Sequence, residues 1–252
     1  MANELHDNVS RVKKANYLGI SIFVGLRAAD AFWQYSLLNR SWAARLVGAL
    51  GGQAVTSAGL ANPYHKIITC MAFGSSLKQI VTLLAVSEQE MNPSSAIMIA
   101  FFNTVFNTLN SILSFWAVTS FAPTPGSLLE IFQTPIIALA VGAYSVGIFT
   151  EQISELQRTW FKKNPANKGK PYAGGLFSLA RHINYGCYTI WRAAYALISG
   201  GYTWGLLVFS FFFSDFARRG VPVLDKYLSE RYGEEWNTIK TQVPYRLIPG
   251  VY

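Results

Sequence analysis

Charged residues are scarce in this sequence. Asp, Glu, Lys and Arg make up 13% of its 252 residues, roughly half the share of an ordinary soluble domain. Hydrophobic residues account for 51% of the chain and aromatic residues for 15%. So little charge cannot cover a soluble surface of ordinary composition, and the balance is typical of a polytopic membrane protein.

Cysteine and histidine are also rare. The two cysteines, Cys70 and Cys187, both lie inside apolar stretches, which excludes a disulfide framework and gives no metal-ligand spacing. The three histidines, His6, His65 and His182, are scattered and form no pair at the spacing that metal sites use. We therefore expect no metal site.

Acidic residues are outnumbered. The chain has 13 of them against 21 Lys and Arg, a net charge of +8. The basic residues sit mostly in short loops beside apolar segments, as they do on the cytoplasmic face of membrane proteins. This placement excludes nucleic acid as the expected partner and favours a membrane-embedded chain.

Long apolar stretches are abundant, and a membrane-crossing helix needs about 20 such residues. We predict an all-α polytopic membrane protein with about six transmembrane helices, at residues 17–38, 67–86, 96–121, 131–149, 183–198 and 202–216. The last two are short and separated by Ser-Gly-Gly at 199–201, which predicts a helical hairpin. A re-entrant or interfacial segment is expected near 43–60, where small residues are frequent, and a solvated basic loop at 150–175.

The distribution of basic residues predicts the topology. The loop before Arg181, the tail after Arg218 and the N-terminal Arg11, Lys13 and Lys14 are all basic, so each should face the cytosol. An even number of crossings follows, and six satisfy it if 43–60 does not cross. A seventh crossing would place the basic N-terminus outside.

The C-terminal tail after residue 220 is polar. Its apolar residues follow helical spacing up to Gly233, which should end that helix. The last nine residues, 244–252, are too aromatic and apolar for a free tail. We expect them to dock back on the membrane domain.

Four charged residues fall at membrane depth. Arg27 and Asp30 lie three apart in the first span and can pair, while Lys78 and Glu130 lie in or beside later spans. Charges at such depth are functional candidates for the substrate end of a site, and a structural bridge is the alternative. A polar stripe in the third span suits helix–helix hydrogen bonding and consists of Asn103, Asn107, Asn110 and Ser114.

The stretch 174–192 runs from a glycine-bearing basic loop into an apolar segment. If it is helical, offsets of three and four place a set of polar side chains on one face, namely Arg181, Asn184, Tyr185, Tyr188 and Arg192. Because unpaired polar groups in hydrocarbon are costly, such a face should turn toward protein, water or a charged ligand. An interfacial anchor with snorkelling arginines is the alternative.

Several blocks in residues 150–252 resemble a known family. They include Arg181-His182-Ile183-Asn184-Tyr185 and the ending Val-Pro-Tyr-Arg at 243–246, in the order found in the membrane reductases of the steroid 5α-reductase and C14/C7 sterol reductase group. The resemblance implies an endoplasmic reticulum protein with both termini cytosolic that uses NADPH to reduce a carbon–carbon double bond in a sterol, terpenoid or related enone. Residues 1–149 would then form the lipid-substrate side, and 150–252 the cofactor pocket.

The resemblance also assigns roles to residues. Asn184 and Tyr185 would contact the nucleotide, with Arg181 and His182 beside them and Arg192 further along the same face. The phosphates and ribose would be held by Arg218, Arg219, Tyr245 and Arg246, and the pocket shaped by Tyr232 and Trp236. Tyr188 or Asp225 is the expected proton donor.

Two departures from the family pattern keep other functions open. Ile183 stands where the family has proline, and Tyr188 where it has glutamate. The isoprenylcysteine carboxyl methyltransferases have a similar hairpin and tail but bind S-adenosylmethionine. A redox-neutral isomerase and a non-catalytic lipid-binding protein are the remaining alternatives, since a fold hosts many functions.

Overall fold

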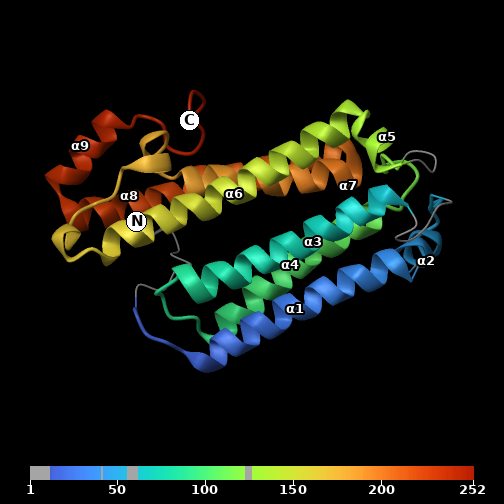
Figure 1. Cartoon of the computed structure of the whole chain (residues 1–252), viewed down its shortest axis with the longest axis horizontal. Coiled ribbons are helices and arrows are strands. Elements are labelled where there is room, and N and C mark those ends of the chain that lie inside the picture. The colour runs from blue at the N-terminus through green and yellow to red at the C-terminus, as the bar shows by residue number, and fades with distance from the viewer. Residues whose placement is uncertain (1–11, 41, 56–61, 123–126) are drawn as a thin grey trace, which may run out of the picture.

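The computed structural model describes residues 12–40, 42–55, 62–122 and 127–252, which form helices joined by short connections (Figure 1). No strand occurs in this part of the chain beyond one isolated bridge between Ala54 and Trp116, so the all-α prediction is confirmed there. The N-terminal segment including Arg11, and residues 56–60 of the segment expected at 43–60, lie outside the described residues.

The helices follow the proline and capping signals of the sequence. Three of the long helices begin with proline directly after a polar residue, at Pro63, Pro93 and Pro135, where the missing N–H costs nothing. The helices are α1 (Tyr17–Asn39), α2 (Trp42–Ala49), α3 (Pro63–Val81), α4 (Pro93–Leu113), α5 (Leu128–Phe132), α6 (Pro135–Lys163), α7 (Ile183–Asp215), α8 (Val221–Tyr232) and α9 (Glu234–Gln242). Two π-helical turns, Thr82–Val86 and Phe216–Gly220, continue α3 and α7.

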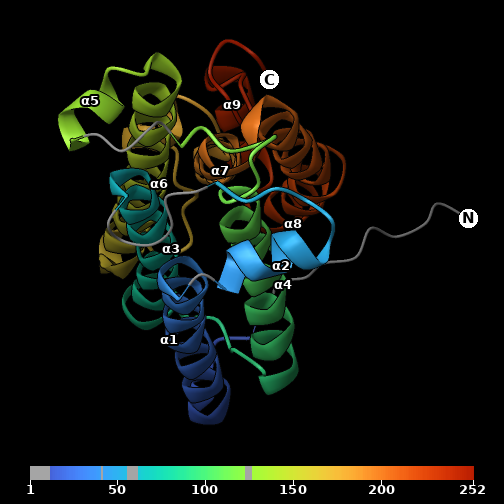
Figure 2. The same cartoon turned by 90° about the vertical axis from the view of Figure 1, so that its right-hand side faces the viewer.

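The long helices form one bundle. Helices α1, α3 and α4 pack together on one side and α6 packs along α7 on the other, with α3 and α4 contacting both groups (Figures 1 and 2). The short helices α2 and α5 lie at one end of the bundle. Helices α8 and α9 and the C-terminus lie at the opposite end (Figure 1).

Four helices in the described residues are long and apolar enough to cross a membrane, which is compatible with an integral membrane protein. They are Pro63–Val86, Pro93–Leu113, Pro135–Lys163 and Ile183–Tyr232. The fourth contains both segments of the predicted hairpin, and α1 coincides with the first predicted span without being among the four. The count of six crossings and the orientation of the tail stay predictions.

The hairpin within α7 is confirmed. Gly200 and Gly201 leave helical geometry, and Gly201 has φ +78°, a conformation that only glycine adopts without strain. The two arms then run back along each other, so that the ring of Tyr185 stacks on Phe216 at 4.4 Å between centroids. A chain of apparently continuous helix therefore reverses at this corner.

Three predicted boundaries are wrong. The helix expected at 96–121 ends at Leu113, because residues 115 and 117 exchange backbone hydrogen bonds with the segment 53–55. The span expected at 131–149 is split before Pro135, which cannot donate to a preceding turn. Helix α6 then continues to Lys163 through most of the expected basic loop, because its buried acids bond neighbouring helices.

The short helix α2 covers the start of the segment expected at 43–60. Its eight residues rise only about 12 Å, too little to cross a bilayer, in agreement with a non-crossing segment. Ala43 and Val47 are buried against the bundle, while Leu46 is exposed. The segment therefore packs across the bundle end rather than through it.

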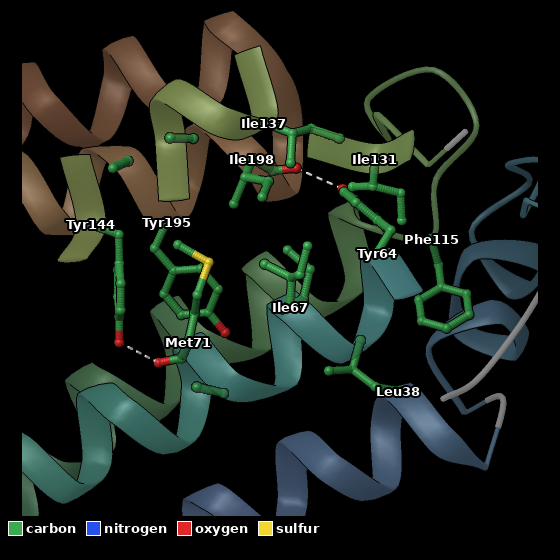
Figure 3. Close-up of a cluster of buried hydrophobic side chains, with 14 of the residues drawn as sticks. Leu38, Tyr64, Ile67, Met71, Phe115, Ile131, Ile137, Tyr144, Tyr195 and Ile198 are labelled. Atoms are coloured by element: carbon green, nitrogen blue, oxygen red, sulfur yellow. Dashed lines mark hydrogen bonds between the residues drawn. The ribbon is translucent and has the colours of Figure 1, made fainter. Parts of the chain in front are cut away.

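The largest apolar cluster joins the two sides of the bundle (Figure 3). Tyr64 on α3 donates a hydrogen bond of 2.6 Å to the carbonyl of Ile198, and Tyr144 on α6 donates one of 2.7 Å to the carbonyl of Met71. These phenols bury their rings and satisfy their hydroxyls at once. The cluster fixes α7 between α3, α4 and α6, which positions the polar residues described next.

Candidate functional site

The predicted docking of the C-terminal segment is confirmed, and it builds one wall of the site. The backbone N–H groups of Arg181 and His182 donate to the carbonyls of Tyr245 and Arg246 at 2.9 and 2.8 Å. Leu247 is fully buried. Gly233 ends α8 as predicted, with a hydrogen bond from its N–H to the carbonyl of Ser229.

Arg181 and His182 precede α7 rather than lying in its first turn, because the helix begins at Ile183. The guanidinium of Arg181 donates from Nη1 to the carbonyls of Val243 at 2.6 Å and Pro244 at 3.2 Å. Burial lowers the pKa of Arg181, with the carboxylate of Asp225 opposing the shift. Its Nη1 therefore holds the tail, while its Nε has no hydrogen-bond partner.

The imidazole of His182 lies at the centre of this end of the bundle. It is 3% exposed, its Nε2 lies 3.5 Å from Oδ1 of Asp225 on α8, and it faces the rings of Tyr185 and Trp236. Burial lowers the pKa of His182, with Asp225 pulling in the opposite direction. The ring is therefore neutral at pH 7 and able to accept a proton.

Four buried polar atoms gather here without a hydrogen-bond partner. They are Nε of Arg181, Nε1 of Trp236, and Nε2 of His182 with Oδ1 of Asp225, which face only each other at 3.5 Å. Buried polar groups are nearly always paired, so a cluster of orphans that offers both donors and an acceptor is suited to a polar ligand. Asp225, His182, Arg181 and Trp236, four residues of the predicted site, are thus brought together.

Two of the three arginines of the predicted phosphate site, Arg219 and Arg246, have partners within the chain. Arg219 pairs with Asp215, with Nε 2.7 Å from Oδ1. Arg246 donates to the hydroxyl of Tyr252 at 2.9 Å and lies over its ring. Arg218 is exposed on the π-helical turn.

The remaining predicted cofactor residues lie around the rim. Asn184 donates to Glu155 on α6 at 2.8 Å, and the hydroxyl of Tyr232 accepts from Lys162 at 3.3 Å. Tyr245 is 41% exposed, whereas Trp236 is buried beside His182. Of the two rings expected to shape the pocket, Trp236 contacts the cluster around His182, whereas Tyr232 contacts Lys162.

A second polar cluster lies deep between α1, α3, α4 and α7. Arg27 and Asp30 pair at 2.9 Å and are both inaccessible, which confirms the predicted pair. Asn107 donates to Asp30 at 2.7 Å and accepts from Arg192, whose Nε also donates to the hydroxyl of Tyr188 at 3.1 Å. The structure thus joins residues that sequence reasoning had assigned separately to substrate, cofactor and catalysis.

Lys78 and Glu130, the other two predicted substrate residues, have different surroundings. Lys78 forms a buried ion pair with Glu151 on α6, and Glu151 also accepts from the indole of Trp191 at 2.7 Å. Glu130 is exposed and forms a capping box with Ser127 at the start of α5. Glu130 lies on α5 at one end of the bundle and contacts neither cluster (Figure 1).

Sequence reasoning missed the role of α6. Glu151 and Glu155 lie four apart and bond Trp191 and Asn184 on α7, although both were placed in a solvated loop. Their helical spacing beside an apolar span was the available signal. The stripe on α4 was predicted correctly as a hydrogen-bonding face, since Asn107 and Asn110 bond Asp30 and Trp204.

Groups of three or more metal-binding side chains are absent from the described part of the chain. The functional candidates are therefore the cluster around His182 at the α8 end of the bundle and the deeper cluster around Arg192. The first lies just before the start of α7, and the second lies further along that helix, within the bundle.

Four apolar helices of this length are compatible with a multi-helix integral membrane protein, and comparison with known proteins identifies its family. Residues 33–243 match the model of the family described as "Protein of unknown function (DUF1295)", which belongs to the steroid 5α-reductase-like group. The chain belongs to this family.

Two curated relatives carry functional names. The chain is 36% identical over 240 residues to the "Probable O-methyltransferase ustE" of Ustilaginoidea virens, an alignment that covers 90% of this chain and 84% of that protein. It is 25% identical over 178 residues to the "Delta(14)-sterol reductase ERG24B" of Gibberella zeae, covering 50% of this chain and 36% of that protein. The relatives therefore support a membrane reductase or a methyltransferase-like protein.

Proposed function

We propose that this protein is a membrane enzyme that transfers a methyl group from S-adenosylmethionine to an oxygen of a hydrophobic substrate. The observation that carries the proposal is the buried pair of His182 and Asp225 beside the unpartnered Nε of Arg181 and Nε1 of Trp236. The longer of the two alignments, to a protein named as a probable O-methyltransferase, supports the same reaction class.

The charges of the site favour this cofactor over NADPH. NADPH carries three phosphate groups, which require free arginine or lysine side chains. Arg219 pairs with Asp215 and Arg246 bonds Tyr252, while Arg181 keeps one unpartnered N–H at Nε, which suits one carboxylate better than three phosphates. S-adenosylmethionine has a single carboxylate and two positive groups, and a buried site with one carboxylate and one free guanidinium N–H matches it.

The residues have separable roles in this proposal. Arg181 Nε and the indole N–H of Trp236 would donate to the cofactor's carboxylate, and Asp225 would accept from its ammonium or ribose hydroxyls. The rings of Tyr185 and Trp236 beside His182 suit a positively charged sulfonium. Bound there, S-adenosylmethionine supplies an electrophilic methyl group.

His182 is the proposed general base. A neutral imidazole accepts the proton of a substrate hydroxyl, and the carboxylate of Asp225 stabilises the resulting imidazolium. The lowered pKa of His182, caused first by burial, keeps the ring in the form that can act. The proposed substrate is hydrophobic, because the helices next to the site are long and apolar enough to cross a membrane.

The second candidate is the NADPH-dependent reduction of a carbon–carbon double bond. The alignment with a sterol reductase and the motif at 181–185 favour it. Tyr188 or Asp225 would then donate the proton. In either case we place the protein in the endoplasmic reticulum membrane, as the family resemblance implies. Both termini are cytosolic in this proposal, because the basic residues of α6, of α8 and of the loop between α6 and α7 lie at one end of the bundle.

Cofactor binding distinguishes the two candidates. The full chain in nanodiscs would be titrated calorimetrically with S-adenosylmethionine, S-adenosylhomocysteine and NADPH. We expect both adenosyl compounds to bind, and Asp225→Asn to weaken them at least about tenfold, a loss of about 1.4 kcal/mol. Glu230→Gln, which makes the same charge change at an exposed position of α8, is the matched control and should bind as the native protein does.

The opposite pattern would overturn the proposal. Binding of NADPH without either adenosyl compound would establish the reductase candidate. Binding of none of the three would exclude both candidates for this chain. Equal effects of Asp225→Asn and Glu230→Gln would show that the cofactor lies elsewhere.

A further inference from the structure

The deep cluster contains one more cation than it has carboxylates. The buried acids of the bundle each have a basic partner, since Asp30 pairs with Arg27, Glu151 with Lys78 and Glu155 with Arg158. Two buried arginines of the described residues have no carboxylate in an ion pair: Arg181, which binds carbonyls of the tail at the end of the bundle, and Arg192 in the deep cluster. Arg192 is 2% exposed, and a charge at such depth is costly unless something opposes it.

The partners of Arg192 are all neutral. Its three nitrogens donate to the hydroxyl of Tyr188 and to the amide oxygens of Asn103 and Asn107. Four aromatic rings surround the guanidinium at 4.9 to 5.8 Å from its central carbon, those of Phe106, Tyr188, Trp191 and Phe212. This arrangement positions the cation firmly and leaves its charge without a counter-ion.

Unpartnered donors lie beside the same cation. Tyr195 and Ser199 share the face of α7 that carries Arg192, at offsets of three and four. Both hydroxyls are fully buried and lack a hydrogen-bond partner, as does Nε of Arg27. Arg27 is connected to Arg192 through Asp30 and Asn107, because Arg27 pairs with Asp30, and Asn107 bonds both Asp30 and Arg192.

We propose that Arg192, together with Tyr195 and Arg27, forms an intramembrane site for the carboxylate of a membrane-soluble organic acid. The unpartnered N–H and O–H groups require an acceptor, and one excess positive charge matches one carboxylate. A phosphate monoester, with a charge approaching −2, would leave the interior negative. The site recognises the substrate or a lipid ligand through this group.

This site is distinct from the cluster around His182. Arg192 lies ten positions after His182, about 15 Å along a helix axis. The inference rests on the charges around Arg192 and does not require a particular cofactor. Failure of one proposal therefore leaves the other standing.

The test uses cis-parinaric acid, an intrinsically fluorescent acid, with its methyl ester as the uncharged control. The full chain would be placed in nanodiscs of zwitterionic lipid at about pH 8.5, where the carboxyl group is ionised. Binding is followed by energy transfer from tryptophan, since Trp191 lies against Arg192. We expect saturable binding of the acid, and binding of the ester at least about tenfold weaker.

Two substitutions locate the effect. Arg192→Gln should abolish the preference for acid over ester, and Arg192→Lys should retain part of it. Arg45→Gln is the control, because Arg45 lines an apolar surface groove of about 260 Å³ with Trp33, Leu37, Trp42 and Leu46 and would matter if lipid bound outside the bundle. It should leave the preference unchanged.

Three results would overturn the proposal. They are equal binding of acid and ester by the native protein, an unchanged preference in Arg192→Gln, and an equal loss in Arg192→Gln and Arg45→Gln. The comparison of acid with ester needs no variant and decides the matter even if Arg192→Gln does not fold. Titration of S-adenosylmethionine into the same sample reports separately on the proposed reaction.

Discussion

Arg181 and Val243, 62 positions apart, are joined by a hydrogen bond of 2.6 Å from the guanidinium to the backbone carbonyl. The same side chain reaches the carbonyl of Pro244, and its own N–H donates to Tyr245. A buried cation thus fastens the C-terminal segment over the start of α7. The candidate site around His182 exists only while this attachment holds.

Arg181→Ala should release the tail. Hydrogen bonds to charged groups contribute about 1.5–3 kcal/mol each. We therefore expect the free energy of unfolding to fall by about 2 kcal/mol or more. Thermal unfolding in detergent would measure it, and limited proteolysis should cut first within 240–252. Arg218→Ala, at an exposed position, should change neither; equal effects of both substitutions would contradict the assignment.

The stability of the protein should fall in acid because of His182. Burial lowers its pKa in the folded state below the ordinary value of 6.5, so below that pH the unfolded state binds more protons than the folded state. The contribution of neutral His182 to the stability of the protein is present above pH 6.5, and it is lost as the pH falls toward the pKa that His182 has in the folded state. Melting temperatures from about pH 8 to 5 should decline less in His182→Asn; parallel curves would refute the effect.

Gly186→Ala should disturb the docked tail. An added Cβ would lie 2.0 Å from the carbonyl oxygen of Leu247, which forces the two backbones apart and costs about 1–3 kcal/mol. Gly142→Ala on α6 is the control, since nothing lies within 4 Å of its added Cβ and the substitution should stabilise the helix by about 0.5–1 kcal/mol. Chemical unfolding of both variants gives opposite signs if the packing is as described.

Lys78→Met should destabilise the bundle by leaving Glu151 buried without its cation. Removing one partner of a buried pair costs about 3–5 kcal/mol, mostly through the charge left behind. Adding Glu151→Gln should restore more than half of the loss, because the amide can still accept from Trp191. If the double variant is no more stable than Lys78→Met, the two residues are not coupled.

Much of the fold followed from local patterns. Apolar length located the helices, and Gly200–Gly201 marked the corner of α7. Three helices begin at prolines a few residues away from the starts expected at 67, 96 and 131. Boundaries failed where a distant partner decided them. The segment 53–55, for example, ends α4 by taking up backbone bonds that no local pattern around residue 114 reveals.

The residues of the candidate site were largely predictable, but their grouping was not. Arg181, His182, Trp236 and Asp225 were all singled out from the sequence, as were Arg27, Asp30, Tyr188 and Arg192. The periodicity of one helix shows which side chains share its face. It cannot show that Asp30 on α1 and Arg192 on α7 bond the same asparagine of α4.

By itself, the sequence determined the helical class, the apolar segments, the excess of basic residues and the polar face of α7, because each depends on residues close together in the chain. Only the tertiary structure decided which charges are paired. It engaged Arg181, Arg219 and Arg246 inside the chain and left Arg192 without a counter-ion. Ion pairing depends on distances between atoms of different helices, and packing of the whole bundle sets those distances.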